Sequence, residues 1–261
     1  MSKHAKIDAV KQKDSYADRR LFYVFVSIII VTVLGVAIFL FIAWYNSETT
    51  QKSQPEIVST ITNKPQGYNF NKLKLTYPDI VAWLDVPNTN IALPIVQHPE
   101  LDYYYLNHNA TSAFDAKGAA YIEKKNSSNF EDPVTLVYGH NMRDDSMFST
   151  EHYFENSQFF NDNDKFYVYK PGHKLTYTVV SAYSYDDRHI LNSFDFTNPS
   201  VRLQYFNSVQ NPSSILKNVR SGVVLDENSK LVQLSTCMSD PKLSNQRYLV
   251  TGVLSNDEET T

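Results

Sequence analysis

The chain has 261 residues, of which 42% are hydrophobic and 20% charged, and its formal net charge is −4 at pH 7. This composition is ordinary for globular proteins and excludes a chain that is disordered throughout. The slightly acidic balance argues against a nucleic-acid binder, and the single cysteine, Cys237, excludes intrachain disulfides and zinc sites built on several thiolates.

The first feature along the chain is an uncharged apolar run from Leu21 to Tyr45. As a helix it would be about 37 Å long, enough to cross a hydrocarbon core of about 30 Å. A cleaved signal peptide would have a shorter apolar region followed by small residues, whereas this run ends in Ala43-Trp44-Tyr45. We therefore predict an uncleaved transmembrane signal anchor over residues 21–45.

The charges that flank this run predict its orientation. Residues 1–20 contain six Lys or Arg and three Asp, whereas residues 46–65 contain only two positive residues. The positive-inside rule then makes residues 1–20 a cytoplasmic tail and places the rest of the chain outside the cell. Residues 46–66 are polar, include two prolines, and are predicted to form an extracellular stalk. An acidic outer domain without disulfides fits the surface of a Gram-positive cell.

Nine segments after the stalk have the β-branched and aromatic residues typical of strands. They are residues 80–86, 91–96, 119–123, 133–138, 165–169, 174–185, 221–225, 231–235 and 248–254. Pro94 places the second of them at a sheet edge or a bulge. Helices are predicted over residues 152–160 and 199–209, with Asn198 capping the second. Many short strands with few helices predict an antiparallel barrel or sandwich over residues 67–256, followed by a C-terminal tail over 257–261.

Three chemically useful side chains fall at the ends of separate predicted strands. A lone cysteine is usually a small buried residue, but Cys237 ends a strand, where a rigid scaffold can hold a reacting group. Arg247 opens the next strand, and its fixed charge would favour a nearby thiolate or hold an oxyanion. His140 follows a third strand, directly after Gly139. If these strands are neighbours in one sheet, the cysteine, histidine and arginine converge.

The other titratable residues give no such pattern. Polar loop or helix contexts, and hence surface positions, are expected for His98, His108, His152, His173 and His189. Asp144 and Asp145 are adjacent, so they point to opposite sides of an extended chain. We expect a solvated loop there rather than a metal site, and we predict neither a metal nor a cofactor.

The segments around the three residues resemble the motifs of class B sortases. The histidine motif is Leu136-Val137-Tyr138-Gly139-His140-Asn141-Met142, with Met147-Phe148 shortly after, and the cysteine motif is Leu234-Ser235-Thr236-Cys237, followed by Arg247. Segments 83–91, 94–97 and 104–106 are similar to the opening strands of that class. The resemblance covers residues 68–254, and the N-terminal anchor also matches the family. The sequence departs from the class pattern at Glu123-Lys124 and at Met238.

The resemblance implies a mainly β fold, a closed eight-stranded sortase barrel with a few peripheral helices, preceded by one transmembrane helix. It implies a cysteine transpeptidase in which Cys237 attacks the threonine carbonyl of a C-terminal sorting signal and forms a thioester. His140 would act first as general acid and then as base, and Arg247 would bind substrate and oxyanion.

The resemblance also implies the binding partners. Tyr138, Ser235 and Leu106 match positions that line the class B groove, although core packing is the commoner role for a leucine. The expected partners are surface proteins with an x-Pro-x-Thr sorting signal and an amine of the peptidoglycan precursor, with no nucleic acid. Two alternatives stay open: a membrane-anchored cysteine hydrolase, and a non-enzymatic surface barrel whose cysteine is merely buried.

Overall fold

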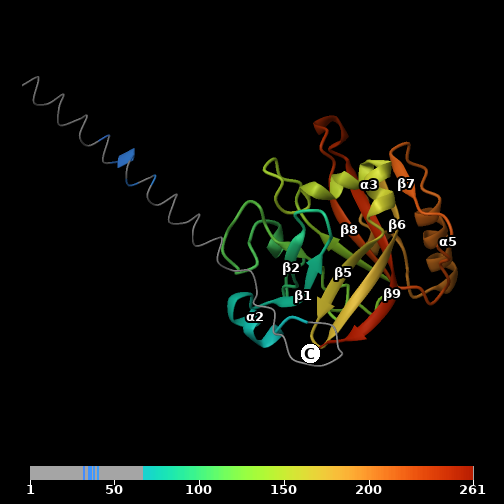
Figure 1. Ribbon diagram of the computed structural model, residues 1–261, viewed down its shortest axis with the longest axis horizontal. Helices are drawn as coiled ribbons and strands as arrows, with labels where there is room; N and C mark the ends of the chain where they lie inside the picture. The colour runs from blue at the N-terminus through green and yellow to red at the C-terminus, as the bar shows by residue number, and fades with distance from the viewer. Residues whose placement is uncertain (1–31, 33–34, 37, 39, 41–66, 261) are drawn as a thin grey trace, which may run out of the picture. The chain divides into compact units, whose positions relative to one another are not determined.

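The computed structural model describes residues 67–260, together with Thr32, Gly35, Val36, Ile38 and Leu40 (Figure 1). The predicted cytoplasmic tail and stalk, and most of the predicted anchor over residues 21–45, lie outside the described residues. Among the residues that are described, no helix combines the length and the apolar character needed to cross a bilayer.

The described domain is dominated by strands. These are β1 (Ile80–Asp85), β2 (Ala92–Val96), β3 (Ala120–Tyr121), β4 (Val134–Tyr138), β5 (Lys165–Lys170), β6 (His173–Asp186), β7 (Lys217–Val219), β8 (Leu231–Cys237) and β9 (Gln246–Glu259). The helices are short: α2 (Phe70–Thr76), η1 (Tyr104–Leu106), η2 (Ser149–Glu155), α3 (Ser157–Asp162), α4 (Ile190–Ser193), α5 (Pro199–Gln210) and η3 (Pro241–Leu243).

The strands form a closed barrel. Their order is β5-β1-β2-β3-β4-β8-β9-β6, and pairing of β5 with β6 closes this ring of eight, while β7 adds to the other side of β6. The predicted eight-stranded barrel is therefore confirmed. The predicted antiparallel arrangement holds for the other strand pairs, but β2 pairs with β3, and β4 with β8, in parallel. The parallel β4–β8 pair brings the carboxyl ends of both strands to the same end of the barrel.

Two hydrophobic layers lie on opposite faces of the sheet because successive strand residues point to opposite sides. Phe148, Phe166 and Tyr248 are among the large side chains that fill the barrel interior. Outside the barrel, α5 packs against β6 (Figure 1). The Tyr205 hydroxyl of α5 donates to Gln233 Oε1 of β8 at 2.6 Å, which ties the helix to the centre of the sheet. A cavity opens in this outer layer, lined in part by Leu136 and Leu249.

The predicted helices are observed with one change. Helix α5 begins at Pro199, and the Asn198 side chain accepts the Ser200 N–H at 2.9 Å, as the capping pattern predicts. The segment 152–160 is helical but not continuous. It splits into η2 and α3 at Asn156, whose extended backbone ends the first helix and whose side chain caps the second.

The strand predictions differ from the structure mainly at their boundaries. The predicted strand at 221–225 is wrong: Gly222 has φ +81° in a turn, and the nearby strand is β7 over residues 217–219. Strand β9 runs to Glu259, three residues into the segment predicted as a tail. Pro94 lies in a part of β2 that pairs only with β1, so its missing N–H removes no ladder bond on the β3 side.

Candidate active site

The register of β8 and β9 places the cysteine and the arginine side by side. Cys237, the last residue of β8, pairs with Arg247 of β9, and opposite residues in an antiparallel pair have Cβ atoms about 4.5–5.5 Å apart. On the other side of β9, Arg247 pairs with Tyr185 of β6. The six residues of β8 before Cys237 are buried, whereas Cys237 itself is exposed. An exposed thiol thus stands at the end of a buried strand.

The parallel register of β4 and β8 brings the histidine to the same place. Tyr138 pairs with Ser235, and two hydrogen bonds extend this alignment past the end of β4. Gly139 N–H donates to the Ser235 carbonyl at 3.1 Å, and the Thr236 hydroxyl donates to the Gly139 carbonyl at 2.8 Å. The next residue, His140, therefore leaves the sheet beside Cys237.

Glycine is required before the histidine. A Cβ atom at Gly139 would lie 2.5 Å from the ring of Phe148, which is fully buried. Phe148 N–H in turn donates to the His140 carbonyl at 2.9 Å. The close approach of this ring to the backbone fixes the path of the chain through His140.

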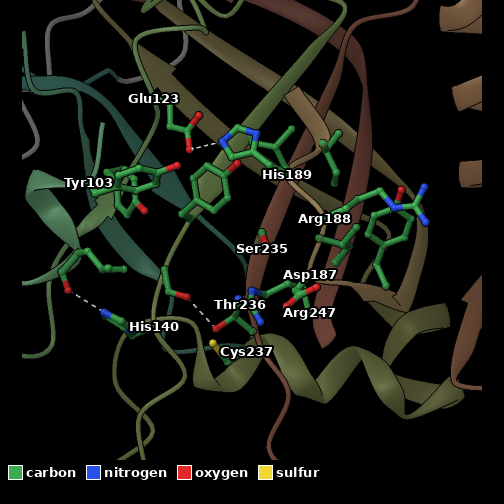
Figure 2. A pocket seen from close by; sticks show the side chains of 18 of the residues that line it. Tyr103, Glu123, His140, Asp187, Arg188, His189, Ser235, Thr236, Cys237 and Arg247 are labelled. Carbon is green, nitrogen blue, oxygen red and sulfur yellow. Dashed lines mark hydrogen bonds and ion pairs between the residues drawn. The ribbon is translucent and has the colours of Figure 1, made fainter. Parts of the chain in front are cut away.

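The His140 ring is held by the loop that contains η1. Its Nε2–H donates to the Leu106 carbonyl at 2.7 Å, and Figure 2 shows the ring turned toward this carbonyl rather than toward the Cys237 sulfur. The Leu106 side chain is 46% exposed and lines the cavity, so the commoner role of core packing does not apply to it. Leu106 therefore contributes both a carbonyl that orients the histidine and an apolar wall.

A cavity of about 270 Å³ connects these residues. Its lining includes all six residues predicted for the site: Leu106, Tyr138, His140, Ser235, Cys237 and Arg247. The remaining walls come mainly from strands β3 and β4 with their flanking residues, and from the connection between β6 and α4 (Figure 2).

Two stacked tyrosines form one wall. The rings of Tyr121 and Tyr138 lie 5.3 Å apart at an interplanar angle of 27°. Burial raises the pKa of both phenols, and the nearby Glu123 carboxyl raises them further. Both phenols are therefore neutral at physiological pH and present stacked aromatic rings to the cavity.

The far end of the cavity carries an ion pair that the sequence did not predict. Glu123 Oε1 lies 2.9 Å from His189 Nε2, and the Glu123 side chain is only 4% exposed. Burial raises the pKa of Glu123, while the adjacent His189 pulls it down. His189 is 26% exposed, so the expectation of a surface position holds only in part, and for His152, which is 11% exposed, it was wrong. No local signal could have found the pair of Glu123 and His189, because it joins the segment after β3 to the segment after β6.

A second ion pair shapes the wall next to Arg247. The Arg188 guanidinium donates to both Asp186 oxygens, through Nε at 2.7 Å and Nη2 at 2.6 Å. This pairing lowers the pKa of Asp186. With Asp187, these residues line the cavity where β6 passes into α4. The cavity therefore carries charges of both signs around an aromatic and aliphatic floor.

The loop that carries the adjacent acids Asp144 and Asp145 contains an exposed ion pair. Asp144 pairs with Lys117 at 2.5 Å, and both side chains are about half exposed. Within the described part of the chain, no group of three His, Cys, Asp or Glu side chains is arranged to hold a metal ion.

Comparison with known proteins identifies the domain. A family model described as the sortase domain matches residues 84–255. The chain belongs to the sortase family. Sortase B of Listeria monocytogenes is 25% identical over 246 residues, which cover 85% of this chain and 94% of that protein. The crystal structure of Clostridium perfringens sortase B is 30% identical, with a TM-score of 0.65, and covers 72% of this chain and 100% of that one.

A third relative supports the same family assignment. A class B sortase of Streptococcus pyogenes, described as involved in pilus biogenesis, is 27% identical with a TM-score of 0.60. The match covers 72% of this chain and 98% of that chain. These relatives confirm class B, as the two motifs indicated. The chain is a cysteine transpeptidase of the cell envelope that acts on sorting signals and a peptidoglycan amine. The alternative of a non-enzymatic binding barrel is therefore wrong.

Proposed function

We propose that this sortase cleaves a sorting signal after threonine and transfers the threonine acyl group to a peptidoglycan amine. The Cys237 thiolate attacks the threonine carbonyl, and the resulting tetrahedral intermediate expels the following residue as an amine, which takes a proton from His140. The product is a thioester on Cys237. The peptidoglycan amine then attacks this thioester, loses its proton to His140, and releases the thiolate.

The observation that carries this proposal is the convergence of three strand ends on one cavity. Cys237 and Arg247 are opposite partners in the β8–β9 ladder, and the β4–β8 alignment delivers His140 to the same edge. A nucleophile, a proton carrier and a fixed cation at one end of a rigid sheet are the groups that acyl transfer requires.

Arg247 is suited to substrate and oxyanion binding. Its Nη1 donates to the carbonyls of Gln246 at 2.9 Å and Ser244 at 3.3 Å. These bonds use one of the two terminal nitrogens and anchor the guanidinium at the cavity wall. The remaining N–H groups of this planar fork supply donors for a peptide carbonyl and for the oxygen that becomes negative during attack.

His140 has to change partner during the reaction. Its Nε2–H bond to the Leu106 carbonyl holds the ring in a defined orientation. To protonate the leaving amine, the ring must release this carbonyl and turn toward the scissile bond. The energy cost is modest because the donor exchanges one hydrogen bond for another.

The sorting signal is proposed to be an x-Pro-x-Thr peptide of the type read by class B enzymes, with Asn-Pro-x-Thr preferred over Leu-Pro-x-Thr-Gly. Tyr138, Ser235 and Leu106 would form the groove that holds it. The paired strand positions of Tyr138 and Ser235 support this, since both are two residues before a proposed catalytic residue, and Leu106 of η1 lines the same cavity. The Staphylococcus aureus sortase B, which shares the fold, has been solved as a complex with its substrate.

The proposed location is the outer face of the cell membrane, with residues 1–20 in the cytoplasm and residues 21–45 as a single-pass anchor. The support is the sequence pattern of the apolar run and its flanking charges. Protease added to intact protoplasts should remove the outer domain and leave a membrane fragment of about 45 residues, as the predicted anchor ends there. A domain protected until lysis would reverse the orientation, and soluble release without a fragment would indicate cleavage.

The reaction is tested by incubating the purified full-length protein with x-Pro-x-Thr peptides and an amine acceptor, followed by mass spectrometry. We expect cleavage after threonine and an amine adduct that forms faster than the hydrolysis product at millimolar amine. Preference for Leu-Pro-x-Thr-Gly would overturn the motif assignment but leave the transpeptidase. Cleavage with no adduct at any amine concentration would instead favour the cysteine hydrolase.

A further inference from the structure

The main-chain carbonyl of Cys237 is held by two side chains from another part of the chain. His152 Nε2 lies 2.9 Å from this oxygen, and the Asn141 amide nitrogen lies 3.0 Å from it. Asn141 also donates to the Ser239 hydroxyl at 3.0 Å. Strand β8 ends at Cys237, so these donors replace the ladder at the point where the strand carries its nucleophile.

His152 is itself fixed on its second nitrogen and on its ring face. Its Nδ1 lies 2.6 Å from Glu155 Oε1, three residues further along η2. Its ring stacks on that of Tyr248 with centroids 4.9 Å apart and an interplanar angle of 23°, and Tyr248 is fully buried. The His152 side chain is 11% exposed, compared with 34% for Glu155. Little freedom remains for this imidazole.

The partners of His152 determine its protonation. A carboxylate and a main-chain carbonyl can only accept hydrogen bonds, so each ring nitrogen must carry a proton to satisfy both contacts. The Asn141 amide nitrogen donates to the same carbonyl at 3.0 Å and lies 3.1 Å from Nε2. Donation from both nitrogens corresponds to an imidazolium held between the Glu155 carboxylate and the main-chain carbonyl of Cys237.

One short segment carries both His140 and His152. The chain after β4 forms a β-bridge between Asn141 and Met147, and Phe148 N–H donates to the His140 carbonyl at 2.9 Å. Helix η2 follows directly from this closed loop. The His152 contact thus connects the main chain of the nucleophile to the loop that delivers the proton carrier, and no described hydrogen bond joins the His140 and Cys237 side chains themselves.

We propose that His152, oriented and kept charged by Glu155, is a positioning residue that fixes Cys237 relative to His140 and favours its thiolate. This inference rests on the proposed role of Cys237 as nucleophile. His152 does not touch the substrate, and its effect passes through the Cys237 backbone and through its charge.

The other ionisable groups around His152 are accounted for. On η2, Glu151 is fully buried, and burial raises its pKa well above the usual range. On β9, burial likewise raises the pKa of Tyr248. Arg247 is the second cation near the thiol, on the opposite strand. Loss of the His152 charge should therefore weaken, but not remove, the positive field at Cys237.

The test uses the full-length protein with His152→Ala, His152→Gln and Glu155→Gln, measuring kcat, KM, thermal midpoint and the pH profile of Cys237 alkylation by iodoacetamide. His173→Gln is the matched control, because His173 also pairs with a carboxylate, Asp257, at 2.8 Å. That pair lies ten residues along β9 from Arg247, about 33 Å away.

We expect His152→Ala to lower kcat about tenfold or more with KM within about twofold, and to move the alkylation profile to higher pH. His152→Gln keeps one donor without charge, so it should recover part of kcat but not the alkylation profile. Glu155→Gln should shift both readouts in the same direction by less, and it replaces His152→Ala if that variant does not fold. His173→Gln should leave kcat and the profile unchanged.

Normal kcat and a normal alkylation profile in His152→Ala would overturn the positioning role. Losses in His152→Ala that follow the thermal midpoint alone, with no change in the alkylation profile, would also overturn it. Retained turnover in Cys237→Ala would instead contradict the proposed function itself, so the two failures are distinguishable.

Discussion

The two ends of the barrel differ in how their strands terminate. At one end, β8 stops at Cys237, β4 stops two residues before His140, and the side chains line a cavity. At the other end, β6 and β9 keep pairing until His173 lies opposite Glu259. There His173 forms an ion pair with Asp257, and each side chain is 38% exposed.

This difference explains where reactivity can arise in the fold. At the second end, ladder hydrogen bonds satisfy the backbone almost to the last strand residue. At the first end the β4–β8 ladder stops at Tyr138 and Ser235, two residues before β8 ends. Side chains then bond to the main chain, as with the Thr236 hydroxyl on the Gly139 carbonyl and His152 on the Cys237 carbonyl. Changes at the first end should therefore act on turnover, and comparable changes at the second end should act on stability alone.

The largest expected effect is from Cys237→Ala, which should abolish turnover and leave the thermal midpoint nearly unchanged because the side chain is exposed. His140→Ala should also lose turnover. At the other end, His173→Ala should keep full turnover and lose less than about 1 kcal/mol of stability, as is usual for an exposed ion pair. Peptide cleavage assays and thermal melts measure both. Turnover in either of the first two variants would mean that other residues perform the chemistry.

Arg247→Lys should lower kcat by about 100-fold while the fold is retained. An ammonium keeps the charge but cannot reproduce the planar fork that bonds to Gln246 and Ser244 while presenting free N–H groups. Steady-state kinetics with a circular dichroism control would measure this. Near-normal turnover in the Arg247→Lys variant would mean that a positive charge is sufficient and that the donor geometry is not needed.

Two glycines give a matched structural comparison between the ends. Gly139→Ala drives a Cβ into the buried Phe148 ring, so it should cost about 1–3 kcal/mol and lower turnover beyond the loss of folded protein. Gly172→Ala, at φ +76° with no atom within 4 Å, should cost only the left-handed backbone strain of about 1 kcal/mol. Urea unfolding and kcat per folded molecule separate the two effects. A fall in kcat for Gly172→Ala would contradict the division of roles.

The smallest expected effect concerns stability against pH. Glu151 of η2 is fully buried, and burial raises its pKa well above the unfolded value of about 4.3. Between these two pKa values the folded state holds a proton that the unfolded state has lost, so rising pH lowers the free energy of unfolding. Glu151→Gln cannot titrate there. Its stability relative to the wild type should therefore grow as pH rises from 4 to 8 in urea titrations; a constant difference would mean that Glu151 is charged in the fold.

The part of the fold that was predictable from sequence is the part that local pattern determines. The β-branched strands, the capped helix at Pro199 and the strand-end positions of Cys237 and Arg247 follow from spacing and residue type. The closed barrel came from the family resemblance, because pairing of β5 with β6 is a long-range contact that periodicity does not encode. The false strand at 221–225 shows the same limit: its apolar residues suit a strand, but Gly222 turns the chain there.

The site was predictable only for residues that lie at the ends of recognisable strands. His140, Cys237 and Arg247 could be named because each follows or opens an apolar strand. Glu123 and His189 meet across the cavity from distant segments, so neither has a local signature. His152 begins a predicted helix and Glu155 follows three positions later, a spacing that predicts an ion pair. What this spacing could not predict is that the other nitrogen of that histidine reaches the Cys237 carbonyl.

The most direct test of the account is the intact mass of the full-length protein during reaction with an x-Pro-x-Thr peptide. We predict an added mass equal to the peptide's acyl portion ending in threonine, located on Cys237 by fragmentation. The adduct should disappear when an amine acceptor is added and be absent in Cys237→Ala. Product formation by Cys237→Ala, or an adduct on any residue other than Cys237, would contradict the central claim that this thiol carries the acyl group.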